Sequence, residues 1–220
     1  VFNPFCCLRE SLSSRFIGSL GDLYRLNHRM HNKLLIADGV MAIAGGRNIG
    51  DEYFMLNMSS NFVDMDAFIM GAVVGQLQDI FDQYWNSDVV FPVQALVPAA
   101  VSPDQMAAEF DRLTWMEHAP PPLPQVDALG YGPPREDLDA GRIGLIWAPA
   151  RAFADPPDKL EKLTAAEARK YSASQEVRMK IWSAETELVL TSPYLIPGPL
   201  GITAFQDLGQ RKVSMVVLTN

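Results

Sequence analysis

A β-hairpin is the first element that the pattern of apolar and polar positions predicts. Residues 30–37 are rich in apolar side chains and contain neither Gly nor Pro, which is typical of a strand. Asp38 and Gly39 form a tight-turn dipeptide. Residues 40–44 are again apolar and are expected to be the returning strand.

Polar side chains gather at the open end of this hairpin. Because alternate side chains of a strand share a face, His31 and Lys33 should point the same way. The returning strand leads into Gly-Gly-Arg-Asn at residues 45–48 and brings this sequence back near His31. The hairpin therefore predicts a polar cluster built from two segments.

Further elements follow from the same periodicity. A loop or short helix is expected over residues 48–61, a strand with a polar start over 62–70, and a helix over 71–85. Helical segments over residues 11–27 are expected to cover one face of the sheet. Trp85 is expected in the core and not as a ligand-stacking group. The apolar stripe of the helix over 71–85 comprises Val73, Val74, Leu77, Ile80, Phe81, Tyr84 and Trp85.

The composition changes after residue 92. Prolines interrupt residues 92–142, which are expected to be a connector with one helix over 102–115 capped by Ser102. A second series of elements follows and predicts a second α/β lobe. We therefore expect an α/β fold divided into residues 1–92, 93–142 and 143–220. The elements of the last part are a strand over 143–148, a turn-rich loop over 154–159, a helix over 171–185, a strand over 187–191, a helix over 199–210 and a strand over 213–219.

Composition and charge restrict the function. The 220 residues are 48% hydrophobic and carry a net charge of −8, so nucleic acid is disfavoured as a partner. Cys6 and Cys7 cannot fill a metal site by themselves and are expected to be small buried residues. Both chain ends read as core strands, so we expect an internal piece of a longer protein. Positive charge is still concentrated in the first 50 residues, at Arg9, Arg15, Arg25, Arg29, Lys33 and Arg47.

The polar cluster has the residue types needed to attack a phosphodiester. A neutral imidazole, here that of His31, can attack phosphorus and carry the phosphoryl group. Lys33 supplies positive charge against the non-bridging oxygens, and the Asn48 amide can donate a hydrogen bond to them. Gly46 lets the backbone approach a phosphate, and Asp38 is expected to hold the hairpin turn. The alternative is that these residues form an ordinary solvated strand face.

A phosphorylated histidine also needs an acceptor at its second ring nitrogen. Asp64 and Asp66 share a face of the strand expected over residues 62–70 and could supply it. We expect Asp66 to be an exposed edge charge.

The sequence His-x-Lys-x4-Asp-x6-Gly-Gly-x-Asn resembles the signature of the phospholipase D superfamily, and residues 31–54 are similar to bacterial cardiolipin synthases of the C type. The family pattern has Ser where this chain has Gly46, which removes one hydroxyl donor. The resemblance assigns the orienting carboxylate to Asp64. It also implies that Ser192 and Tyr194, in a Ser-Pro-Tyr sequence, line the substrate cleft, with packing at the end of a strand as the alternative.

The resemblance implies a phospholipase D-like fold, with a mixed sheet flanked by helices. The chain would hold the carboxyl-terminal part of one lobe and the start of a second, cut before the second copy of the motif. The implied activity is phosphatidyl transfer through a phosphohistidine, without a cofactor or metal. The implied partners are phosphatidylglycerol, phosphatidylethanolamine as a further substrate, and a bacterial membrane surface bound peripherally.

Three alternatives remain open at this point. A phospholipase D-type hydrolase and a nuclease would share the chemistry, and a non-catalytic lipid-binding or partner-binding module would not use it. The sequence leaves open the acceptor lipid, the order in which two histidines act and the oligomeric state. One motif in the chain predicts that this piece alone is a poor catalyst.

Overall fold

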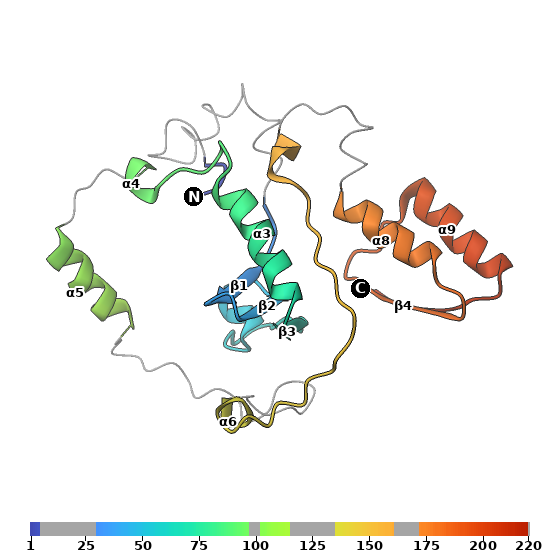
Figure 1. The fold of residues 1–220 in the computed structure, drawn as a ribbon, viewed down its shortest axis with the longest axis horizontal. Helices are drawn as coiled ribbons and strands as arrows, with labels where there is room; N and C mark the ends of the chain where they lie inside the picture. The colour runs from blue at the N-terminus through green and yellow to red at the C-terminus, as the bar shows by residue number, and fades with distance from the viewer. Residues whose placement is uncertain (5–29, 97–101, 115–134, 161–171, 220) are drawn as a thin grey trace. The chain divides into compact units, whose positions relative to one another are not determined.

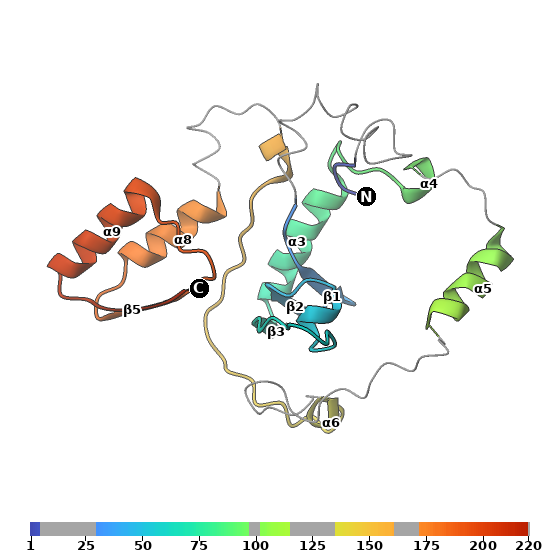
Figure 2. The same cartoon turned by 180° about the vertical axis from the view of Figure 1, so that it is seen from behind.

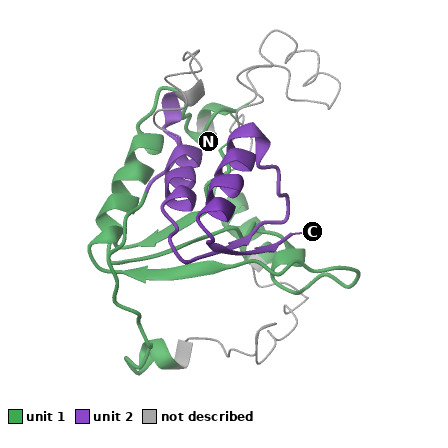
Figure 3. Cartoon of the chain, turned by 90° about the vertical axis from the view of Figure 1, so that its right-hand side faces the viewer, with its two compact units in different colours: residues 1–19, 29–152 green, residues 20–28, 153–220 purple. Residues whose placement is uncertain are grey.

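The computed structural model describes residues 1–4, 30–96, 102–114, 135–160 and 172–219 (Figure 1). The helical segments expected over residues 11–27, both cysteines and the basic residues before Met30 lie outside this part of the chain. The described residues fall into two compact units, one ending at Ala152 and the other beginning at Phe153 (Figure 3). The domain boundaries expected at residues 92 and 142 stay a prediction.

The first unit contains a three-stranded antiparallel sheet of order β1-β2-β3 (Figure 2). The strands are β1 Leu34–Ala37, β2 Met41–Gly45 and β3 Asp66–Met70. The turn between β1 and β2 has positive φ angles at both central residues, 52° at Asp38 and 67° at Gly39. These angles suit the two-residue turns that match the twist of paired strands. The predicted hairpin is therefore confirmed.

Two strands begin later than the sequence predicts. β1 starts at Leu34, which pairs with Ala44, whereas the expected strand begins at residue 30. β3 starts at Asp66, which pairs with Gly45, whereas the expected strand begins at residue 62. β3 begins opposite the last residue of β2, Gly45, whereas β1 begins opposite Ala44, one residue before that end.

Helix α3, Val73–Trp85, contacts all three strands of this sheet. Val74 is 1% exposed and Ala42, on the central strand, is 2% exposed, so this interface is the core of the first unit. The register aligns Ile36, Ala42 and Ile69 in one row across the sheet. Helix α3 lies along the sheet in Figures 1 and 2.

The end of α3 does not reach the core. Trp85 is 64% exposed and stacks on Phe81 with ring centroids 5.8 Å apart, so the expectation of a buried Trp85 is wrong. A helix of 13 residues is about 20 Å long. A strand of five residues spans about 17 Å.

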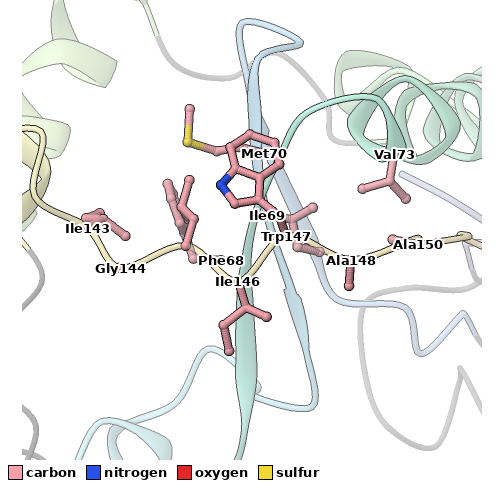
Figure 4. Close-up of a pocket in the computed structure, with 11 residues that line it drawn as sticks. Phe68, Ile69, Met70, Val73, Ile143, Gly144, Ile146, Trp147, Ala148 and Ala150 are labelled. Carbon is pink, nitrogen blue, oxygen red and sulfur yellow. The ribbon is translucent and has the colours of Figure 1, made fainter.

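Residues 143–148 form an extended segment and not the predicted strand. Leu145 N donates to Ile143 O at 2.9 Å, so part of the backbone bonds locally and not to a neighbouring strand. This segment and the side of β3 line an open cavity of about 430 Å³ (Figure 4). The cavity is lined by Phe68, Ile69, Met70, Val73, Ile143, Gly144, Leu145, Ile146, Trp147, Ala148 and Ala150.

The second unit contains a β-α-β element. Strands β4 Glu187–Thr191 and β5 Ser214–Leu218 pair in parallel, and α9 Gly198–Gln210 connects them. Ala204 and Leu208 of α9 are buried, as is Val213 before β5. The strands and helix predicted here are confirmed, and parallel pairing is typical of an α/β fold.

Helix α8, Ala173–Trp182, precedes β4 and contacts α9. Ser172 caps it, because its Oγ accepts a hydrogen bond from Gln175 N at 3.2 Å. The 3₁₀ helix η2, Pro157–Leu160, lies in the predicted turn-rich loop.

Four further helices complete the described elements. They are the 3₁₀ helix η1 Asp51–Tyr53, α4 Val93–Leu96, α5 Pro103–Thr114 and α6 Arg135–Asp139. Ser102 caps α5 as predicted, since its Oγ accepts from Gln105 N at 3.2 Å and its own N donates to Gln105 Oε1 at 3.0 Å. On α5, a hydrogen bond from Arg112 holds the pKa of Glu109 below its ordinary value. Among the described residues, no helix combines the length and apolar character needed to cross a membrane.

Candidate active site

Five candidate residues of the first unit lie in segments that flank one end of the three-stranded sheet. Leu34 pairs with Ala44 on one side of β2, and Gly45 pairs with Asp66 on the other. The residues that precede β1, follow β2 and precede β3 therefore share an end, which we call the site end. The candidates at the site end are His31, Lys33, Gly46, Asn48 and Asp64.

His31 and Lys33 are in direct contact. Lys33 Nζ lies 3.0 Å from His31 Nδ1 and 3.3 Å from Nε2, and it donates to His31 O at 2.8 Å. The contact places the Lys33 ammonium group beside the His31 imidazole ring. His31 is exposed and so accessible to a substrate.

Asp64 lies directly against Gly46. A Cβ at position 46 would overlap the Asp64 carboxylate and would lie 2.9 Å from its Cγ. Gly46 N donates to Met65 O at 3.3 Å, and Asp64 Oδ1 accepts from Met65 N at 2.8 Å. The absent side chain at position 46 thus makes room for the carboxylate at the site end.

Arg47 joins several segments at the site end. Its Nε lies 2.6 Å from Asp66 Oδ2, its Nη2 donates to Asp64 O at 3.1 Å, and its Nη1 donates to Tyr53 O. Its backbone N also donates to Asp66 Oδ1 at 3.4 Å. The Phe54 ring lies beside the guanidinium, with its centroid 5.7 Å from Cζ. The sequence pattern marks Arg47 only as one of several basic residues.

Asp66 corrects an expectation. It is not an exposed edge charge, because it forms a half-buried ion pair in which the Arg47 and Asp66 side chains are 30% and 22% exposed. Asp64 and Asp66 also do not share a strand face as expected, since Asp64 precedes β3. The sequence contained two signals for this ion pair. They are an arginine inside the Gly-Gly-x-Asn sequence and an aspartate at the polar start of the next strand.

The other predicted residues are placed as follows. Asp38 lies in the turn between β1 and β2, at the end of the hairpin opposite His31. Ser192 and Tyr194 belong to the second unit, where Ser192 Oγ donates to Tyr194 O at 3.2 Å and Tyr194 is 78% exposed. Within the described part of the chain, no hydrogen bond joins His31 to Asn48 or Asp64.

The cavity next to β3 is apart from these residues, because none of the candidates lines it. It is mainly apolar, and Figure 4 shows the side chains of Trp147 and Met70 among those that line it. Within the described ranges, no three His, Cys, Asp or Glu residues gather in a way that could hold a metal ion.

Comparison with known proteins finds relatives among bacterial cardiolipin synthases. Over its whole length the chain is 31% identical to cardiolipin synthase C of Escherichia coli strain K12, of which it covers 45%. It is 28% identical, again over its whole length, to an uncharacterised protein of Helicobacter pylori strain 26695, of which it covers 42%. A match of 124 residues, 52% of the chain, is 34% identical to cardiolipin synthase 1 of Staphylococcus aureus strain MRSA252 and covers 25% of it.

The chain spans less than half the length of the curated relatives that it matches from end to end. No family model matches it, and no solved structure does.

Proposed function

Because the chain belongs to the phospholipase D superfamily, as a relative of bacterial cardiolipin synthases, we propose that its full-length protein is a phosphatidyltransferase working through a phosphohistidine. It would move a phosphatidyl group from one phospholipid to the hydroxyl of another. Phosphatidylglycerol is the proposed substrate, and phosphatidylethanolamine would be a further substrate. The protein would act at the surface of the bacterial membrane, bound peripherally.

The observation that carries this proposal is the contact between His31 and Lys33 within the motif. The imidazole would attack phosphorus, forming an N–P bond while the bond from phosphorus to the leaving alcohol breaks. Lys33, 3.0 Å from the ring, is close enough to offset charge on the non-bridging oxygens. The leaving oxygen takes a proton from a second histidine, which the resemblance assigns to the other lobe.

Further residues have supporting roles in this proposal. Asn48 would donate to the phosphate through its amide. The small Gly46 leaves room for the Asp64 carboxylate, so it is not proposed to let the phosphate approach the backbone. Asp64 would accept a hydrogen bond from the attacking histidine and fix its tautomer when substrate orders the site. Asp38 would hold the hairpin turn, and Ser192 and Tyr194 would contact the lipid from the second lobe.

Replacement of His31 tests the proposal. His31→Ala in the full-length protein should lower transfer at least about 1000-fold, because it removes the nucleophile. Lys33→Ala should lower it by about 100-fold to 1000-fold, because one charge-stabilising group is lost. The measurement is thin-layer separation of products from labelled phosphatidylglycerol, with and without phosphatidylethanolamine.

His118→Ala is the matched control, because no lysine follows His118 two positions later, and it should leave transfer unchanged. Unchanged transfer by His31→Ala would reject the catalytic role and favour a lipid-binding or partner-binding module. Phosphatidic acid in place of cardiolipin would identify a hydrolase, and cleavage of DNA would identify a nuclease.

A further inference from the structure

All three nitrogens of the Arg47 guanidinium are already engaged by protein. Nε contacts the Asp66 carboxylate at 2.6 Å, while Nη2 and Nη1 bond to the carbonyl oxygens of Asp64 and Tyr53. Asp66 neutralises the charge, and its second carboxylate oxygen accepts from Arg47 N at 3.4 Å. Although Arg47 lies inside the sequence predicted to bind phosphate, its guanidinium charge pairs with a carboxylate of the protein and not with a phosphate.

The partners of Arg47 all belong to segments of the site end. Arg47 itself stands between Gly46 and Asn48, and one of its acceptors is the backbone carbonyl of Asp64. Tyr53 closes the 3₁₀ helix that follows Asn48. One side chain therefore ties the segment after β2, the 3₁₀ helix and the segment before β3 to one another.

Residues 46–50 and 62–65 lie outside the strands. Two backbone hydrogen bonds also join these segments, from Gly46 N to Met65 O at 3.3 Å and from Phe62 N to Glu52 O at 2.8 Å, and Arg47 adds three side-chain bonds to them. A misplacement of about 1 Å in a catalytic group can lower a rate about 100-fold. The positions of these backbone segments thus decide whether Asn48 and Asp64 are correctly placed.

We propose that Arg47, braced by Asp66, is a positioning residue that holds Asn48 and Asp64 in place for the reaction. The proposal rests on the proposed function for its catalytic consequence. It excludes Arg47 as a direct phosphate ligand. The two roles make opposite predictions for removal of the Asp66 carboxylate. If Arg47 were a phosphate ligand, the removal would free it to bind the phosphate. If Arg47 is a positioning residue, the removal would take away the group that holds it in place.

A double-mutant cycle in the full-length protein separates these roles. Arg47→Ala and Asp66→Asn should each lower kcat by about 10-fold to 100-fold, and KM for lipid should change by less than about threefold. The kcat of the double variant should be no lower than that of the less active single variant, because both substitutions break the same interaction. Arg47→Lys should stay impaired, because one ammonium cannot reach three separate acceptors.

Arg211 provides a matched control. Its Nε contacts Asp207 at 2.9 Å, and its other nitrogens donate to Ala184 O and Trp182 O at 2.8 Å, which repeats the bonding pattern of Arg47 in the second unit. Arg211→Ala should lower thermal stability without lowering kcat at a temperature where the protein stays folded. A loss of kcat equal to that of Arg47→Ala would overturn the proposal.

Two further results would overturn it. Full activity of Asp66→Asn, together with a raised KM in Arg47→Ala, would identify a phosphate ligand. Full activity of Arg47→Lys would mean that charge alone matters.

Amide hydrogen exchange tests the positioning role of Arg47 independently of the proposed function. Arg47→Ala should speed exchange in residues 46–53 and 64–66 by at least about tenfold, and His31→Ala should not. Unchanged exchange in Arg47→Ala would refute the brace even if His31 is essential. Absence of lipid transfer by the wild-type protein would refute the proposed function while the exchange result still decides on the brace.

Discussion

The Asp64 carboxylate occupies the space beside Gly46 that a Cβ would fill. We expect Gly46→Ser, which introduces the residue of the family pattern, to displace this carboxylate. The free energy of unfolding should fall by about 1 kcal/mol, the lower end of the range for overpacking, because a carboxylate at the site end can move aside. Urea denaturation measures the change.

Gly144→Ala is the control for this substitution, because nothing lies within 4 Å of a Cβ at position 144. It should change the free energy of unfolding by less than about 0.5 kcal/mol. Equal stability of Gly46→Ser and wild type would contradict the crowding at position 46.

At the residue scale, the sequence indicates which residue types carry the chemistry but not how each is bonded. His31 and Lys33 could be paired in advance because they are only two residues apart, although the structure places them just before β1 and not in the predicted strand. The role of Arg47 could not, because its partners are 6, 17 and 19 residues away. A basic residue inside a sequence that is predicted to bind phosphate has the same local pattern whether it binds a phosphate or a carboxylate.

At the scale of elements, two substitutions in α3 should change the free energy of unfolding in opposite directions. Gly75 lies inside the helix, and a Cβ added to it would have no atom within 4 Å, so Gly75→Ala should raise the free energy of unfolding by about 0.5–1 kcal/mol. Val74 is 1% exposed, so Val74→Ala should lower it by about 2 kcal/mol through loss of buried methyl groups.

Urea denaturation of the two variants beside wild type measures both effects. A loss of stability in Gly75→Ala would mean that this face of α3 is covered. No loss in Val74→Ala would contradict the packing of α3 on the sheet.

Elements with a strong periodic pattern in their own sequence were predicted well. Strands that depend on pairing with a neighbouring strand were not. Helix α3 and the β4-α9-β5 series follow from periodicity and turn residues. Residues 30–33, 62–65 and 143–148 also have strand-like composition, but none of them is in a strand. A strand needs a neighbour of matching length, and that length is a property of the sheet.

At the scale of the whole molecule, one motif in 220 residues predicts weak catalysis by this chain alone. Loss of a general acid typically costs about 100-fold to 10,000-fold in rate. The isolated chain should therefore transfer lipid at least about 100-fold more slowly than the full-length protein. Activity per mole, measured with both proteins on the same labelled vesicles, checks this.

A matched rate would mean that two copies of the chain share one site. Size-exclusion chromatography of the active sample would then show a dimer. A monomer with the full rate would refute the two-motif mechanism.

The parallel strands β4 and β5 have a practical consequence. In the part of the chain that the structure describes, these two strands pair only with each other, and every residue of β5 is exposed. Unpaired strand edges act as templates for further strands, and a sheet of two strands is only marginally stable. The isolated chain is therefore prone to concentration-dependent self-association through its second unit, and solutions of it should be kept dilute.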